Sequence, residues 1–173
     1  MKSTLFFITN IAPTIILGLM MRYGRRIFKE DFSQIDSKLN RESIFNSFCI
    51  AIMGFSILSK LFSLLITQQP VISHIQTPIM YVYAIAFSPV FEELICRKYI
   101  FTKLHKRYNF WLSAILSSII FAIPHFNAVN FIGYVFIGIV WSWYYKKTDN
   151  ILVPIFSHLL FNYFVILFMS LKG

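Results

Sequence analysis

Two adjacent acidic residues, Glu92 and Glu93, lie inside a long apolar stretch of the chain. An ionisable side chain within a hydrophobic span costs several kcal/mol to insert and is rarely present without a function. Glu93 and Arg97 are four residues apart with the acid first, so they face one another on a helix and the pairing keeps Glu93 ionised. Glu92 points about 100° away from Glu93 and has no such partner in its own helix. Glu92 is therefore a candidate general base, which could take a proton from water and later hand it to a leaving amine.

Two other apolar stretches carry histidines. His125 lies four residues after Phe121, and His158 lies four residues before Asn162, so the members of each pair share one helical face. A single histidine in an apolar helix is often only an interhelical hydrogen-bonding partner. Three separate stretches that each supply polar side chains indicate instead one shared polar site. We predict that it consists of Glu92, Glu93, His125, His158 and Asn162.

Depth in the membrane is the weak point of a single site. At about 1.5 Å per residue, Glu92 lies about 16 Å from the helix end expected near Lys103, and Asn162 lies at a similar depth. His125 lies about 22 Å from Phe110, which is deeper than the others. Helix tilt, or a helix that starts within the membrane, would bring His125 to the same level.

Prolines accompany all three polar stretches, at positions Pro89, Pro124 and Pro154. A proline inside a helix removes one backbone donor and frees a carbonyl group. We predict that Pro89 and Pro124 open their helices where water or a substrate strand must enter. Pro154 suits the first turn of its helix, where the missing donor has no consequence.

The composition predicts that these side chains belong to a membrane protein. Hydrophobic residues make up 57% of the 173 residues and charged residues only 13%, whereas a soluble domain needs far more charge to cover its surface. We predict an all-α membrane protein, because the apolar stretches approach bilayer-crossing length and none alternates as a barrel strand would. Six spans are expected, at roughly 4–21, 44–66, 78–97, 110–126, 130–145 and 151–170.

Basic residues set the predicted orientation. The formal net charge is +9, but the Lys and Arg residues cluster at the ends of apolar spans, which is typical of membrane topology and not of nucleic-acid binding. With six spans, 13 of the 16 basic residues fall on one side, which we predict to be the cytoplasmic side of a bacterial cell membrane. Segment 30–43 carries Phe32, Ile35 and Leu39 at helical spacing. A disordered loop is the alternative, but we predict a short amphipathic helix on that surface.

Three smaller features complete the expected architecture. Residues 4–21 are interpreted as a retained first span, because the stronger positive charge follows them and no small-residue cleavage pattern is present. Cys49 and Cys96 lie in or beside apolar segments and are expected to be buried thiols rather than a disulfide. Lys60 falls near the outer end of its span and is expected to snorkel to the headgroups.

Three motifs follow one another in the C-terminal half: EExxxR at 92–97, FxxxH at 121–125 and HxxxN at 158–162. In this order they resemble the CPBP family, the CAAX proteases and bacteriocin-processing enzymes that are also called the Abi family. The resemblance covers about half of the chain. Within it, small and turn residues also stand where the family has them, at Gly133, Gly138, Thr148 and Pro154. We therefore divide the single integral-membrane domain, 1–173, into a catalytic core at 80–169 and two N-terminal spans with a basic segment at 1–77.

The resemblance implies a membrane endopeptidase that cuts without a covalent enzyme intermediate. Glu92 and His125 would position and deprotonate the attacking water, while His158 and Asn162 would stabilise the oxyanion. These roles fit the chemistry, since water needs a base and the developing negative charge needs preorganised donors. The expected partners are the bilayer and a peptide or protein substrate entering from the membrane or the cytoplasmic side, and no cofactor is expected. The residues carried over are the catalytic Glu92, His125, His158 and Asn162 and the supporting Glu93 and Arg97.

Alternatives stay open at this stage. Two histidines and a glutamate could hold zinc with one free position, although the HExxH motif is absent. The same scaffold could bind a peptide without cutting it, as a bacteriocin self-immunity protein or a membrane chaperone would. A small transporter is disfavoured, because the spans are few and no inverted repeat is visible. The sequence leaves open the oligomeric state and the substrate, which could be a prenylated C-terminus, a leader peptide, a bacteriocin or a signalling peptide.

Overall fold

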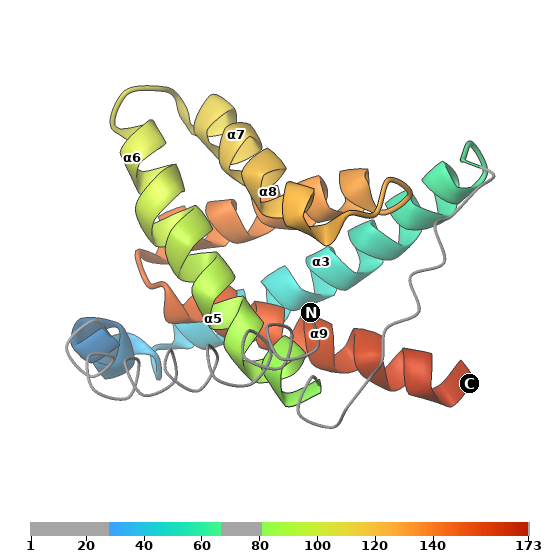
Figure 1. The fold of residues 1–173 in the computed structure, drawn as a ribbon. Helices are drawn as coiled ribbons and strands as arrows, with labels where there is room; N and C mark the ends of the chain where they lie inside the picture. Colours follow the sequence, from blue (N-terminus) through green and yellow to red (C-terminus); the bar gives the residue numbers. More distant parts are fainter. Residues whose placement is uncertain (1–27, 67–80, 173) are drawn as a thin grey trace, which may run out of the picture.

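The structure is a computed structural model that describes residues 28–66 and 81–172. These residues are helical, with no β strand among them, which confirms the predicted all-α class (Figure 1). The principal helices are α3 (Lys38–Ser63), α7 (Phe110–Ala122), α8 (Phe131–Thr148) and α9 (Leu152–Lys172). A composite helix runs without interruption through η2 (Tyr83–Phe87), α5 (Ser88–Glu93), η3 (Leu94–Phe101) and α6 (Thr102–His105). Two of its parts, η2 and η3, are π-helical, and a single 3₁₀ turn, η4 (Ile123–His125), follows α7.

Two helices are long and apolar enough to cross a membrane, Lys38–Ser63 and Leu152–Leu171. Only 11% and 39% of the residues in their most apolar stretches are buried within the protein, whereas the core helix of a soluble protein would be mostly buried. The other predicted spans that the structure describes also correspond to helices, with ends shifted by a few residues except for 78–97, whose helix continues to His105. Six membrane crossings stay a prediction, and the first of them, 4–21, lies outside the described residues.

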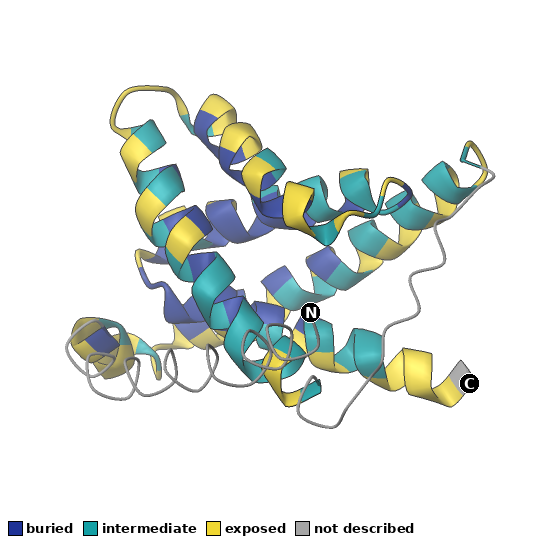
Figure 2. Ribbon diagram, in the orientation of Figure 1, coloured by how far each residue is buried: buried dark blue, intermediate teal, exposed yellow. Residues whose placement is uncertain are grey.

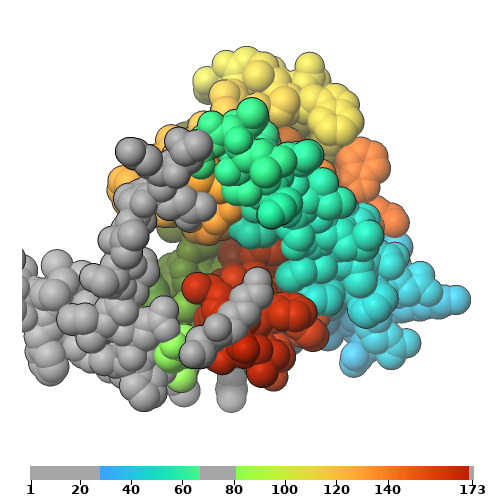
Figure 3. Space-filling model, turned by 90° about the vertical axis from the view of Figure 1, so that its right-hand side faces the viewer, coloured from blue at the N-terminus to red at the C-terminus, as the bar shows by residue number. Residues whose placement is uncertain are grey.

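α8 lies at the centre of the helix packing, with α3, α7, α9 and η3 in contact with it. Figure 2 shows the buried residues gathered where these helices meet, and Figure 3 shows α3 and α9 side by side on one face. Small residues allow the close approach that helices in membranes use. A Cβ at Gly138 would lie 2.6 Å from the Ser118 Oγ of α7, and one at Gly133 would lie 2.7 Å from a ring carbon of Phe55 in α3.

The predicted amphipathic helix at 30–43 is wrong in its bounds. The described residues 28–34 are helical, and this helix ends before residues 35–37. Leu39 already belongs to α3, because Ser37 caps that helix by accepting the Asn40 N–H. Of the expected apolar face, Ile35 packs together with Phe28 against α9, whereas Phe32 and Leu39 are exposed, so its contact with the membrane surface stays a prediction.

Asp31 fastens the helical residues 28–34 to the start of α9. Its Oδ1 accepts the Ile151 N–H at 3.0 Å, and its backbone carbonyl accepts the Asn150 side-chain amide at 2.8 Å. Its Oδ2 lies 3.3 Å from the Lys98 Nζ of η3. Asn150 in turn caps α9 through the Leu152 N–H. One carboxylate therefore joins three segments, two of which carry residues of the predicted site.

The minor predictions agree with the structure in part. Cys96 is buried, Cys49 is half-buried, and both are free thiols. Lys60 is exposed in the last turn of α3, as a side chain reaching for the headgroups would be.

Candidate active site

The composite helix and α7 form a hairpin that brings two of the predicted residues to one level. Asn109 begins α7, because its side chain accepts the Leu112 N–H at 2.9 Å. The composite helix continues to His105, two residues further than expected, so Glu92 lies 13 residues before the turn and His125 lies 15 residues into the second arm. Glu92 and His125 line the same cavity, so the expected mismatch in depth does not keep them apart.

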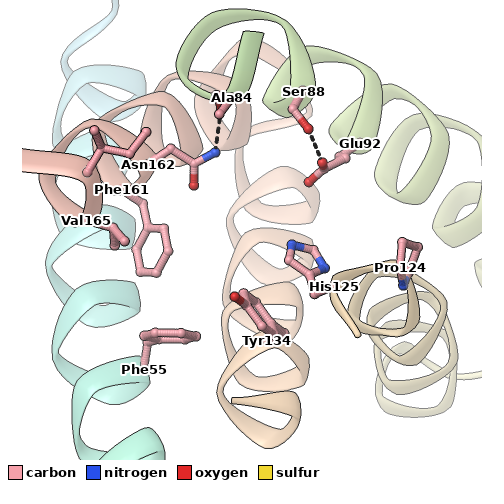
Figure 4. A pocket seen from close by; sticks show the side chains of 11 residues that line it. Phe55, Ala84, Ser88, Glu92, Pro124, His125, Tyr134, Phe161, Asn162 and Val165 are labelled. Atoms are coloured by element: carbon pink, nitrogen blue, oxygen red, sulfur yellow. Dashed lines mark hydrogen bonds between the residues drawn. The ribbon is translucent and has the colours of Figure 1, made fainter. Parts of the chain in front are cut away.

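A cavity of about 330 Å³ opens at this level, between the composite helix, α8, α9 and the end of α7 (Figure 4). The aromatic rings of Phe55 and Phe161 and the side chain of Val165 form apolar parts of its wall. Its polar lining comes from four different helical segments and consists of Ser88, Glu92, His125, Tyr134 and Asn162. A peptide group entering the cavity would thus meet a few polar groups within an otherwise apolar surface, as is usual in ligand sites.

The carboxylate of Glu92 lies at the cavity with 29% of its side chain exposed, and both of its oxygens have polar neighbours. The Ser88 hydroxyl, one turn earlier, donates a hydrogen bond to Oε1. The Nε2 of His158 lies 3.7 Å from Oε2. The Nδ1 of the same ring lies 3.0 Å from the Oε1 of Glu93, which fits an N–H donated to that buried carboxylate. His158 therefore bridges the two adjacent glutamates.

The predicted pair of Glu93 and Arg97 is confirmed. The Arg97 Nε lies 3.1 Å from the Glu93 Oε2, and neither side chain has any exposed surface. The contact is an ion pair without hydrogen-bond alignment, and neither terminal guanidinium nitrogen has a hydrogen-bond partner within the described part of the chain. Aromatic faces supply the remaining stabilisation, since the guanidinium carbon lies 4.6 Å from the ring centroid of Phe121 and 5.6 Å from that of Trp141.

Each histidine stacks on an aromatic ring of α8. His125 lies 3.9 Å from Tyr134 between ring centroids, and His158 lies 4.1 Å from Trp141. Tyr134 and Trp141 are seven residues apart, so they share one helical face. The His125 Nδ1 also lies 3.0 Å from the Phe121 carbonyl, which fits an Nδ1–H donor and leaves Nε2 as an acceptor. The FxxxH spacing thus orients the imidazole as well as placing it.

Asn162 is held by a carbonyl group that Pro89 leaves free. In the π-helical segment η2 the backbone bonds span five residues, as in the bond from the Ser88 N–H to the Tyr83 carbonyl. The next such bond would run from residue 89 to the carbonyl of Ala84, but proline has no N–H to donate. The Asn162 Nδ2 occupies this acceptor at 2.8 Å. Pro89 therefore acts on the site through the backbone, and does so without opening the helix as the sequence had suggested.

We expect Pro89→Ala to lower kcat for the reaction proposed below by up to about 10²-fold, the loss that a misplacement of about 1 Å can cause. The alanine N–H competes with Asn162 for the Ala84 carbonyl and frees the amide to rotate. Stability should hold or rise, since proline is unfavourable inside a helix. Steady-state kinetics and thermal unfolding in detergent measure the two effects.

Pro154→Ala is the matched control, because Pro154 lies in the first turn of α9, where a proline frees no acceptor. It should keep the wild-type kcat. Equal turnover by the wild type and the Pro89 variant would show that the freed carbonyl does not position Asn162.

The structure brings together all the predicted site residues, but in two layers. Three of them, Glu92, His125 and Asn162, line the cavity, and behind Glu92 lie the buried Glu93, Arg97 and His158. Sequence reasoning missed Ser88, Tyr134 and Trp141. Ser88 had a signal in its spacing, four residues before Glu92, whereas the aromatic residues of α8 look like any others in an apolar helix.

Within residues 28–66 and 81–172 no group of three or more His, Cys, Asp or Glu side chains is arranged to hold a metal ion. The zinc alternative stays untested.

Comparison with known proteins identifies the class to which this fold and site belong. The family model described as type II CAAX prenyl endopeptidase, Rce1-like, matches residues 74–164, which is more than half of the chain. The chain is therefore a member of this family of membrane peptidases, and the predicted resemblance to the CAAX proteases is confirmed.

Two curated bacterial relatives support the assignment. YdiL of Bacillus subtilis (strain 168), which carries the name of a membrane peptidase, is 37% identical over 90 residues, or 52% of this chain and 37% of YdiL. The membrane-embedded CAAX protease MroQ of Staphylococcus aureus (strain USA300) is 33% identical over 113 residues, or 61% of this chain and 45% of MroQ. The chain thus matches less than half the length of either relative. No solved structure matches it significantly.

Proposed function

We propose that the chain is an intramembrane endopeptidase that hydrolyses a peptide bond with a water molecule activated by Glu92 and His125. The observation that carries the proposal is the cavity, in which a carboxylate, an imidazole and an amide from separate helices face the same space (Figure 4). These are the groups that acyl transfer to water requires: a base, a group that orients the nucleophile, and a donor for the oxyanion. Membership of a peptidase family supports the same chemistry.

In the proposed reaction the Glu92 carboxylate takes a proton from water while the oxygen of that water attacks the scissile carbonyl carbon. The Nε2 of His125 accepts the second hydrogen of the water and orients it, because Nδ1 is engaged with the Phe121 carbonyl. One amide N–H of Asn162 is bound to Ala84, and the other is free to donate to the oxyanion. When the carbon–nitrogen bond breaks, Glu92 returns its proton to the leaving amine, and a carboxylic acid and an amine are released.

His158 takes a different place in this proposal from the one that the sequence predicted. Its expected oxyanion role stays a prediction, but both of its ring nitrogens face carboxylates, and the side chain is only 2% exposed. We therefore propose that His158 positions Glu92 against Glu93. The bridge fixes the angle at which the Glu92 carboxylate meets the cavity, and the Trp141 ring supports it from one side.

The surroundings of the site suggest the kind of substrate. The cavity is partly walled by apolar residues and belongs to a membrane protein, so the substrate is a peptide or protein that reaches it from the bilayer or the cytoplasmic side. In this proposal the protein is an integral protein of the bacterial cell membrane with its basic loops in the cytoplasm. A prenylated C-terminus and a leader peptide are both compatible with such a cavity.

The test uses the full chain in proteoliposomes and a panel of internally quenched peptides, with and without a C-terminal farnesyl-cysteine. Products are identified by mass spectrometry in ¹⁸O-labelled water. We expect hydrolysis of at least one peptide, with the label in the new carboxyl group. His125→Ala should lower kcat by about 10²-fold or more, because the attacking water loses its orienting acceptor.

His105→Ala is the matched control, since His105, in α6, stacks on Phe101 of η3 and lies outside the cavity. It should cleave as the wild type does. If the His125 variant cut as fast as the wild type, the mechanism would be wrong. Binding of a peptide without any cleavage would favour the alternative of a peptide-binding or self-immunity protein.

A further inference from the structure

Tyr134 is a polar residue of the cavity that the proposed mechanism does not use. It belongs to the first turn of α8, lines the same cavity as Glu92 and Asn162, and stacks on His125. In Figure 4 its hydroxyl lies at the end of the ring turned away from His125, toward the space between Asn162 and Phe55. The ring alone accounts for the stacking with His125 and for the contact with Phe55, whose centroid lies 5.2 Å away. The hydroxyl is needed for neither contact.

Most of the hydrogen-bond donors around the cavity already have an acceptor within the protein. The Ser88 hydroxyl donates to Glu92, and the His125 Nδ1 is used by the Phe121 carbonyl. His158 lies behind Glu92 with both nitrogens against carboxylates. Among the cavity residues, two donors are left: the second amide N–H of Asn162 and the hydroxyl of Tyr134, which takes part in no hydrogen bond within the described part of the chain.

A tetrahedral oxyanion is stabilised best by preorganised donors in a site that excludes water. A single N–H donor from Asn162 would stabilise the negative charge of the oxyanion only weakly, because the same amide group already donates to the Ala84 carbonyl. The Tyr134 ring is held between His125 and Phe55, so its hydroxyl can swing little. A donor held in this way loses little entropy when the negative charge forms.

We propose that Tyr134 is a further catalytic residue, whose hydroxyl donates a hydrogen bond to the oxyanion of the tetrahedral intermediate together with Asn162. The inference rests on the proposed peptide hydrolysis and adds a second oxyanion donor to it. No proton is transferred in this step: the phenol O–H donates to the oxyanion while the intermediate exists, and the bond weakens when the carbonyl reforms. The same ring holds the imidazole of His125 in place, so Tyr134 acts on both the oxyanion and the nucleophile.

The test compares the wild type with Tyr134→Phe, which removes the hydroxyl and keeps the ring on His125. We expect kcat for the quenched peptide that the wild type cuts fastest to fall by about 10²-fold, with KM unchanged, as for the loss of one oxyanion donor. A phosphinic peptide, whose charged tetrahedral group mimics the oxyanion, should bind about 10²-fold more weakly to the variant. The uncut ground-state peptide, measured on a background of Glu92→Gln, should bind equally well in both cases.

Tyr144→Phe is the matched control, because it removes a hydroxyl from the same helix at a residue outside the cavity. It should leave kcat and phosphinic peptide binding unchanged. Tyr134→Leu also removes the ring that stacks on His125, so its kcat should be lower than that of Tyr134→Phe. A Tyr134→Phe variant with wild-type kcat and wild-type phosphinic peptide affinity would overturn the inference while leaving the proposed hydrolysis intact. A wild type that neither cuts any peptide nor prefers the phosphinic peptide would overturn both.

Discussion

Replacing Glu92 with glutamine should lower kcat for peptide hydrolysis by about 10²- to 10⁴-fold, which is the contribution of a positioned general base. Glutamine has nearly the same shape, and its carbonyl oxygen can still accept the Ser88 hydroxyl. What it loses is the ability to take a proton from water and return it to the leaving amine. The binding of substrate should change little, so the effect should appear in kcat and not in KM.

The control for this change is Glu42→Gln, which removes a carboxylate from the exposed ion pair with Lys38 in α3. It should retain wild-type turnover, because a surface pair of this kind contributes little. Thermal unfolding of both variants separates loss of chemistry from loss of fold. Full turnover by a folded Glu92→Gln protein would exclude Glu92 as the base and with it the proposed mechanism.

Replacing Arg97 with methionine should destabilise the protein by about 3–5 kcal/mol, the usual result of removing one member of a buried ion pair. The Glu93 carboxylate would remain fully buried with His158 as its neighbour and without its cation. Methionine retains part of the contact with the Phe121 and Trp141 rings. The decrease in the free energy of unfolding would therefore come mainly from removal of the positive charge. Denaturation by SDS in mixed micelles measures the change.

A double variant separates the charge from the packing. Glu93→Gln together with Arg97→Met leaves no unpaired buried ion, so we expect it to recover a large part of the stability lost in the single variant. Arg107→Met is the matched control, since this arginine is exposed in the turn after α6 and should unfold as the wild type does. If the single Arg97 variant were as stable as the wild type, the buried pair would have no structural role.

The part of the site that follows helical periodicity could be predicted from the sequence. The spacing of four residues placed Glu93 against Arg97, and the expense of ions in an apolar span singled out Glu92 and Glu93 before any contact was known. These inferences need only one helix at a time. Polar side chains in three separate apolar stretches then indicated one shared site with His125, His158 and Asn162, and the family resemblance supplied the roles of these residues.

The rest of the site depends on contacts between helices and on departures from α-helical bonding. Nothing local marks η2 as π-helical, so the free carbonyl of Ala84 and its hold on Asn162 were not predictable. Tyr134 and Trp141 lie in a helix that is apolar on all sides, where no polar face indicates a direction. The break at 35–37 was missed because the apolar spacing continues across it, while the cap at Ser37 starts a new helix.

The hairpin between the composite helix and α7 constrains how the length of this protein can change during evolution. The position of Glu92 and that of His125 each depend on the number of residues between it and the same turn. One residue inserted between the turn and either site residue would therefore rotate the side chain of that residue by about 100° and shift it by about 1.5 Å along the helix. Insertions within the turn at 106–109 leave both counts unchanged. Homologues with an intact site should therefore differ in length at this turn and keep both arms free of insertions and deletions.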